Sequence, residues 1–428
     1  MIDLQTDYFN PFSFNYIKDL FLILKCFLYL SIVSTIDKYF MRIYILFAVM
    51  MCSFLFCTAK EKTIIIGAAQ TGTYFPLLKQ KKVALFSNQT GMVGDKLTID
   101  ILVEHGIHVV TIFSPEHGFR GDADAGKRIN NSIDAKTGIP IYSLYNGKKK
   151  IPAANIMNKF DVLVVDIQDV GLRFYTYYIT MFHLMDACAK YHKTMLILDR
   201  PNPNGFYVDG PILDMKYKSG VGCLPIPVVY GMTLGELAQM INGEHWLPDS
   251  EVCKLKIIPC QNYTHQTKYQ LPIAPSPNLP NMKSVYLYPS LCYFEGTPIS
   301  IGRGTTTPFQ IYGHPNMMGY TFNFTPQKML GANNPPQLNK TCYGIDLRGL
   351  TDQEIWNNGL DLSYVIKAYK NLNIGDNFFH PFFELLIGVD YVRKMIEANK
   401  SAAEIKAMWK NDDEKFKIKR RPYLLYNE

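Results

Sequence analysis

One acidic residue lies in a segment that is typical of catalytic loops. Glu116 stands in Ser114-Pro115-Glu116-His117-Gly118, directly after an apolar run, and Arg120 follows shortly after it. A carboxyl group close to a histidine and an arginine, with glycines that permit close backbone approach, suits proton transfer. We therefore predict that Glu116 is a catalytic acid/base. His117 either tunes Glu116 or bonds to the backbone, and Arg120 orients it.

Dense polar segments also follow three other apolar runs. Asn88 and Gln89 follow the first run, and two further segments begin at Asp166 and Asp199. Because ligands of an open parallel sheet bind beyond the carboxyl ends of its strands, we expect these segments to meet Glu116 at one rim. The candidates for contact with a substrate in these segments are Asn88, Gln89, Gln168, Arg173, Tyr175, Arg200 and Asn202.

Several of these residues also have a structural interpretation. Residues 88–91 fit a plain turn, and residues 199–202 fit a loop that is held by a buried ion pair. Asp166 and Asp169 are candidates for a second catalytic carboxyl group, although Asp166 also suits the anchoring of its loop. Tyr175 either stacks on a sugar or packs in the core.

A second group of charged residues comes later in the chain. Glu295 lies in Phe294-Glu295-Gly296, and Arg303 lies between two glycines, two residues before Thr305. Such a loop presents a guanidinium group to an anion, because arginine offers paired donors to a carboxylate. The chain has no phosphate-binding glycine motif, no serine-hydrolase elbow and no specific metal spacing. We predict a site with neither metal nor cofactor.

The elements that position these residues follow from the apolar pattern. Short β-branched runs alternate with helical segments from residue 81 to residue 198, which predicts an α/β fold with a doubly wound parallel sheet over residues 60–210. Proline and glycine are frequent beyond this point, and residues 211–428 are expected to form a C-terminal α+β domain that completes the cleft. Helices are predicted from Thr233, with Glu236 closing a capping box, and over residues 381–397.

The N-terminal part has the layout of a secretory signal. Met41-Arg42 precedes an apolar stretch over residues 43–56, and Cys57-Thr58-Ala59 comes before a charged segment. We expect residues 1–59 to be an extension with a signal peptide that starts at Met41, and the protein to be periplasmic or associated with the cell envelope. A membrane anchor formed by two apolar stretches is the alternative. An oxidising compartment would allow disulfides such as Cys253 with Cys260.

Charge gives little support to a nucleic-acid partner. The net charge is +7, and part of the excess lies at residues 415–421, where a solvated helix face explains it. No zinc-finger or helix-turn-helix spacing is present. We predict no nucleic-acid binding, and the oligomeric state stays open.

The polar segments together resemble one known family. In chain order, residues 87–91, 113–121, 166–177, 198–205 and 300–305 are similar to motifs of the exo-β-N-acetylmuramidases of glycoside hydrolase family 171, formerly DUF1343. The resemblance runs from about residue 63 to the C-terminal tyrosines. It implies a Rossmann-like catalytic domain with an auxiliary domain, and it maps the leading catalytic glutamate of that family onto Glu116.

The resemblance also implies an activity and a substrate. Members of the family release N-acetylmuramic acid (MurNAc) from non-reducing ends of peptidoglycan fragments, so saccharides such as MurNAc linked to N-acetylglucosamine (MurNAc-GlcNAc) are the expected partners. Asp166, Asp169 or the 2-acetamido group of the substrate could complete the chemistry. Arg173, Arg200 and Arg303 are candidates for the lactyl carboxylate of MurNAc. The alternative function is a cell-wall glycan-binding protein without turnover.

Overall fold

The computed structural model describes residues 63–115, 119, 131–144 and 151–428, together with five isolated positions before residue 48. Residues 63–428 form one compact unit. Glu116, His117, Arg120 and the predicted signal segment lie outside the described residues, apart from those isolated positions. Over the part of the chain that is described, no helix has the length and apolar character needed to cross a membrane.

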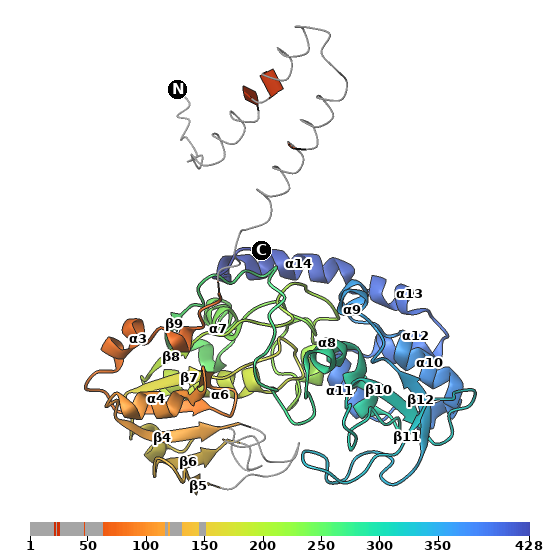
Figure 1. Cartoon of the computed structure of the whole chain (residues 1–428), viewed down its shortest axis with the longest axis horizontal. Helices are drawn as coiled ribbons and strands as arrows, with labels where there is room; N and C mark the ends of the chain where they lie inside the picture. The colour runs from red at the N-terminus through yellow and green to blue at the C-terminus, as the bar shows by residue number, and fades with distance from the viewer. Residues whose placement is uncertain are drawn as a thin grey trace. The chain divides into compact units, whose positions relative to one another are not determined.

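A seven-stranded sheet forms one end of this unit (Figure 1). Its order is β5-β6-β4-β1-β7-β8-β9, and only the β5 and β6 pair is antiparallel. The strands are β1 (Val83–Ser87), β4 (Val109–Ser114), β5 (Ser132–Ile133), β6 (Pro140–Ser143), β7 (Val162–Asp166), β8 (Thr194–Leu198) and β9 (Lys254–Ile258). When the edge strand β5 is left out and the other six strands are numbered in chain order, their order in the sheet is 3-2-1-4-5-6. This is the order of a Rossmann-like sheet. The predicted doubly wound α/β fold is confirmed.

Helices cover both faces of the sheet because successive strand residues point to opposite sides. Ala84 and Phe86 of β1 belong to a core that they share with α6 (Tyr177–Lys190) and α7 (Leu234–Gly243). Val83 and Leu85 belong to a second core with α3 (Thr71–Leu78) and α4 (Thr98–Glu104). Every residue of β1 and β7 is buried, as expected for strands between two helical layers.

The C-terminal part combines helices with a small antiparallel sheet, which Figure 1 shows at the other end of the compact unit. The sheet has the order β10-β12-β11, formed by β10 (Ile311–His314), β11 (Asn323–Phe324) and β12 (Cys342–Asp346). A separate pair joins β2 (Met92–Val93) and β3 (Lys96–Leu97). The division at residue 210 stays a prediction.

The remaining helices have the following bounds. The α-helices are α5 (Ala154–Met157), α8 (Met282–Leu291), α9 (Asp352–Asn358), α10 (Ser363–Leu372), α11 (Phe382–Ile387), α12 (Tyr391–Glu397), α13 (Ala402–Ala407) and α14 (Lys410–Arg420). The 3-10 helices are η1 (Gly67–Ala69), η2 (Met215–Tyr217), η3 (Pro248–Ser250), η4 (Cys292–Gly296), η5 (Gly375–Asn377) and η6 (Arg421–Tyr423).

Local sequence signals predicted one helix well and another incompletely. The capping box of Thr233 and Glu236 is present at the start of α7. The single helix predicted over residues 381–397 is instead two helices, α11 and α12, because Gly388 ends α11 with a left-handed φ of 80°.

Candidate active site

The polar segments meet where the direction of strand addition reverses in the sheet. After β1 the chain adds β4 and β6 on one side, and it then returns to place β7 on the other side of β1. Ser87 pairs with Asp166 at the ends of β1 and β7. The loops that follow these strands diverge, and this is where ligands of such sheets bind. The structure thus brings the segments after β1, β7 and β8 to one rim.

A buried ion pair holds this rim together. Arg200 Nε donates to Asp166 Oδ1 at 2.6 Å, and Arg200 Nη2 donates to Asp166 Oδ2 at 3.0 Å. Thr98 Oγ1 also donates to Asp166 Oδ2 at 2.5 Å, and the carbonyl of Met92 accepts from Arg200 Nη2. The two charged side chains are 0% and 4% exposed. This geometry corresponds to the structural interpretation, in which Asp166 anchors the loops after β1, β7 and β8.

Two amide side chains fix the loops after β1, β7 and β8. The side-chain oxygen of Asn88 accepts from the backbone N–H and the hydroxyl of Thr90, and its amide donates to the Tyr177 hydroxyl at 2.8 Å. The Gln168 amide donates to the carbonyls of Asp169 and Pro201 at 2.8 and 2.7 Å. Asn88 and Gln168 are therefore buried residues that fix loop geometry.

One backbone carbonyl accepts hydrogen bonds from side chains of the segments that follow β1 and β7. Pro275 O accepts from the hydroxyl of Tyr175 at 2.8 Å, from that of Tyr177 at 3.3 Å, and from the Gln89 amide at 3.3 Å. The Tyr175 ring also packs edge-on against the rings of Tyr177 and Tyr288. The contribution of Pro275 was not predicted from the sequence, because a backbone carbonyl acceptor gives no signal in the residue type.

Asp169 is buried beneath the rim. Its Oδ1 accepts from the Gly171 N–H at 2.7 Å and from the Tyr230 hydroxyl at 2.8 Å. Its Oδ2 is buried, and no hydrogen-bond partner for it is found among the described residues. The carboxyl group lines a small cavity with Asn202 and Thr233. Burial raises the pKa of Asp169 to about 7.

This raised pKa predicts a specific pH dependence of stability. The folded protein favours the neutral form of Asp169. The contribution of this group to the free energy of unfolding is therefore complete below the usual pKa of 3.8, and it is lost as the pH rises to about 7. Burial also raises the pKa of Asp199 to about 6, which acts in the same direction. We expect Asp169→Asn to remove about 2–3 kcal/mol of the fall in unfolding free energy between pH 5 and 8. Urea unfolding at both pH values measures this, and equal falls in the variant and the wild type would show that neutral Asp169 does not stabilise the fold.

Two other residues that were predicted to contact the substrate donate hydrogen bonds to backbone carbonyls. Arg173 is fully buried, and its guanidinium donates to the carbonyls of Pro211, Ile226, Leu386 and Ile387. The Asn202 amide donates to Met232 O at 2.9 Å, and its side-chain oxygen accepts from the Asn204 N–H. These contacts give Arg173 and Asn202 structural roles, and contact of either residue with a sugar stays a prediction.

Arg303 differs from the other two predicted arginines in its exposure. Its Nη1 donates to Glu295 Oε1 at 3.0 Å, and the two side chains are 21% and 24% exposed. Gly302 and Gly304 have left-handed φ values of 75° and 82°, which fix the loop on both sides of Arg303. Thr305 closes the loop through its hydroxyl, which donates to Gly302 O at 2.6 Å.

One helical face connects Arg303 with the rim. Tyr288, Cys292 and Glu295 are four and three residues apart along α8 and η4, so they lie on the same face. The first of them packs against Tyr175 and the last pairs with Arg303. One face of α8 and η4 therefore links Tyr175 at the rim to the pair of Glu295 and Arg303.

A turn over residues 327–332, which was not predicted from the sequence, extends this rim. The Gln327 N–H donates to Gly304 O at 2.7 Å, and the Asn278 amide donates to Gly331 O at 3.0 Å. The turn thus joins the Arg303 loop to the segment that contains Pro275. In the described part of the chain, no cluster of three or more His, Cys, Asp or Glu suits a metal ion. A site without a cofactor stays a prediction.

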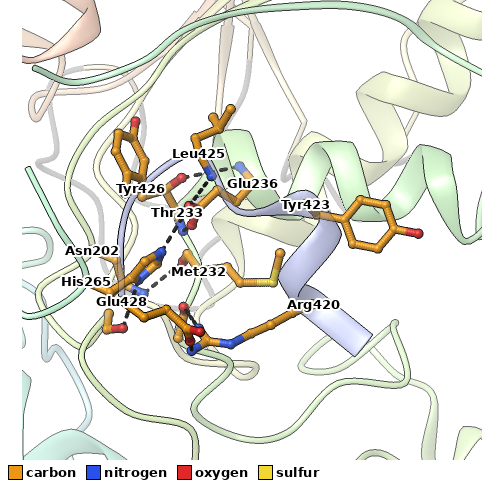
Figure 2. A network of polar contacts seen from close by, with 12 residues as sticks. Asn202, Met232, Thr233, Glu236, His265, Arg420, Tyr423, Leu425, Tyr426 and Glu428 are labelled. Carbon is orange, nitrogen blue, oxygen red and sulfur yellow. Dashed lines mark hydrogen bonds and ion pairs between the residues drawn. The ribbon is translucent and has the colours of Figure 1, made fainter. Parts of the chain in front are cut away.

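Residues near the C-terminus hold the loop after β8 in place through hydrogen bonds. Figure 2 shows Leu425 and Tyr426 beside Glu236 and His265. Glu236 Oε1 lies 3.0 Å from His265 Nε2 and accepts from the Leu425 N–H at 2.8 Å. The Tyr426 hydroxyl donates to Asp199 Oδ2 at 2.6 Å. Residues 425 and 426 thus belong to the same folded unit as the seven-stranded sheet.

Comparisons with known proteins agree with this arrangement. Residues 83–283 match the family model of the exo-β-N-acetylmuramidase NamZ N-terminal domain, and residues 286–426 match that of its C-terminal domain. A peptidoglycan β-N-acetylmuramidase NamZ from Bacillus subtilis is 36% identical over 399 residues, which cover 86% of this chain and 94% of that protein.

Two crystal structures of DUF1343 family proteins from Bacteroides fragilis are also similar. One is 66% identical with a TM-score of 0.81 and covers 86% of this chain and all of that chain. The other is 29% identical with a TM-score of 0.71 and covers 85% of this chain and 99% of that chain.

The fold and the rim define an α/β enzyme with a site at the carboxyl ends of its parallel strands. The matches over both halves identify the enzyme as a glycosidase. The chain belongs to the exo-β-N-acetylmuramidase family.

Proposed function

We propose that this protein releases MurNAc from non-reducing ends of peptidoglycan fragments during cell-wall turnover. The observation that carries the proposal is the match of residues 83–426 to both domains of one muramidase family. The similarity to the B. subtilis relative, which extends over 94% of that protein, also supports the proposal. A glycan-binding protein without turnover is not favoured.

The test of this function uses two disaccharides that differ only in order. The full chain should release MurNAc from MurNAc-GlcNAc and should leave GlcNAc-MurNAc intact, because an exo-acting enzyme needs MurNAc at the non-reducing end. Chromatography of the products measures both reactions. Binding of MurNAc-GlcNAc without release across pH 5 to 8 would identify the glycan-binding protein instead.

The chemistry needs a proton donor and stabilisation of positive charge at the anomeric carbon. We assign the proton donor to Glu116, two residues beyond the end of β4. Asp166 has both carboxylate oxygens engaged by Arg200 and Thr98, and Asp169 lies beneath the rim. Neither aspartate is therefore placed to attack the anomeric carbon. We propose that the 2-acetamido group of the substrate attacks this carbon instead. A MurNAc-derived thiazoline should then inhibit competitively.

We assign recognition of the lactyl carboxylate to Arg303. The guanidinium groups of Arg173 and Arg200 are buried and occupied by carbonyls and by Asp166, whereas Arg303 is partly exposed and has one ion pair. A charge-assisted hydrogen bond contributes about 1.5–3 kcal/mol, so Arg303→Met should lower kcat/KM for an aryl β-MurNAc substrate by about 10–100-fold.

The same variant should change kcat/KM for an aryl β-GlcNAc substrate much less, because that sugar has no lactyl group. Arg348→Met is the matched control, since Arg348 pairs with Asp346 on the small sheet. Equal losses on both substrates would remove Arg303 from carboxylate recognition.

We also propose that the protein is exported to the periplasm or the cell envelope. The layout of residues 41–59 supports this location, which suits a peptidoglycan substrate. N-terminal sequencing of the protein from fractionated cells distinguishes a cleaved signal from a retained anchor. Recovery in the cytoplasmic fraction alone would contradict export.

A further inference from the structure

Two cysteines meet in the core at the base of the sheet. Cys188 lies in the last turn of α6, and Cys253 directly precedes β9. Their exposed fractions are 0% and 1%. Both are free thiols in the same hydrophobic core. The neighbouring Cys253 thiol, together with burial, raises the pKa of Cys188.

Backbone contacts independently bring the two positions together. The Lys193 N–H donates to Cys188 O at 2.8 Å, which ends α6 close to the start of β8. The next residue, Thr194, pairs with Lys254, the neighbour of Cys253. The two chain segments therefore converge at the same end of the β8 and β9 pair.

The position of Cys253 is also fixed by a side chain. The Asn242 amide donates to Cys253 O at 2.9 Å, and Asn242 Oδ1 accepts from the Cys253 N–H at 3.1 Å. Asn242 belongs to α7, which packs in the same core as α6. Secondary structure thus holds both cysteines in place without a covalent bond.

The same geometry corrects the pairing that sequence spacing suggested. Cys253 and Cys260 lie at opposite ends of β9, and its five residues span about 17 Å. Disulfides require Cα atoms within about 7 Å of each other. Cys260 instead donates through its thiol to Asp199 O at 3.2 Å.

We propose that Cys188 and Cys253 form a disulfide during oxidative folding. Two S–H bonds break and one Sγ–Sγ bond forms, while two electrons and two protons pass to the disulfide of a small-molecule or protein oxidant, whose S–S bond breaks to give two thiol groups. Because both thiols are buried in the folded protein, the exchange takes place before the core closes. The proposal does not depend on the glycosidase activity.

The bond would close a loop of about 65 residues that contains β8, the rim segment after it and α7. Closing such a loop stabilises a protein mainly by restricting the unfolded chain. It would also fix α6, whose first residue, Tyr177, contacts Asn88 at the rim.

The experiment starts from the denatured and reduced full chain, refolded in a buffer of reduced and oxidised glutathione. Free thiols are alkylated under denaturing conditions, and peptides are mapped by mass spectrometry. We expect the peptides of Cys188 and Cys253 to be linked to each other. Full alkylation of both cysteines in the refolded protein would overturn the proposal.

Thermal unfolding gives a second readout. Wild type that is refolded in the presence of reductant should have a Tm about 5 °C lower than wild type refolded in the glutathione buffer. Cys188→Ala should lose this response, and Cys342→Ala, a control in β12, should keep it. The same response to reductant in Cys188→Ala would also overturn the proposal, because it would place the disulfide elsewhere. The kcat for MurNAc release should not differ between the oxidised and reduced wild type.

Discussion

Glu116→Gln should lower kcat for release of MurNAc from MurNAc-GlcNAc by about 10²–10⁴-fold, the usual contribution of a general acid or base. Glutamine has the same shape as glutamate but cannot deliver a proton to the leaving oxygen. Affinity for the sugar should stay close to that of the wild type, because the sugar contacts are retained. Steady-state kinetics and calorimetric titration measure the two quantities.

The leaving group separates an acid from a merely structural residue. An aryl glycoside with a strongly acidic phenol needs little protonation, so Glu116→Gln should lose much less activity on it than on the disaccharide. Glu104→Gln is the matched control, because Glu104 is an exposed residue of α4 that pairs with Lys96. A uniform loss on both substrates, or activity near that of the wild type, would remove Glu116 from proton transfer.

The predicted rim was found because buried parallel strands and their polar ends leave a strong pattern. The apolar runs before Asn88, Asp166 and Asp199 became β1, β7 and β8 in the expected order. Strands covered on both faces must be continuously apolar, so their ends are visible in the sequence.

The roles of individual rim residues could not be predicted in the same way. Asp166 and Arg200 have the residue types of a catalytic pair, yet both are used to join loops. Arg173 has the residue type of a carboxylate ligand, yet backbone carbonyls surround it. Whether a charged side chain faces a ligand or the protein depends on contacts from segments distant in sequence, such as residues 386–387, which no local motif records.

The same limit applies to the part of the site that comes from the C-terminal half. The Pro275 carbonyl and the turn over residues 327–332 complete the rim through backbone atoms. Cysteine spacing was similarly uninformative. The strand β9 separates Cys253 from Cys260, whereas the pairing of β8 with β9 brings Cys253 close to the end of α6 that carries Cys188.

Asp166→Asn should have the largest effect on stability among the rim residues. Removing the carboxylate leaves the Arg200 guanidinium buried at 4% exposure without its counter-charge. Loss of one partner of a buried ion pair typically costs about 3–5 kcal/mol. Arg200 would no longer hold the loops after β1 and β8 together, so activity should also fall. Urea unfolding gives the loss in unfolding free energy.

A double-mutant cycle distinguishes the ion pair from simple packing. Arg200→Met alone leaves Asp166 unpaired, whereas the double variant leaves no buried charge, so its loss should be smaller than the sum of the two single losses. Asp346→Asn is the control, because the pair of Asp346 and Arg348 is exposed and should contribute less than about 1 kcal/mol. Additive losses at residues 166 and 200 would mean that the two side chains stabilise the rim independently. The rim would then depend on the separate hydrogen bonds of Thr98 and Met92.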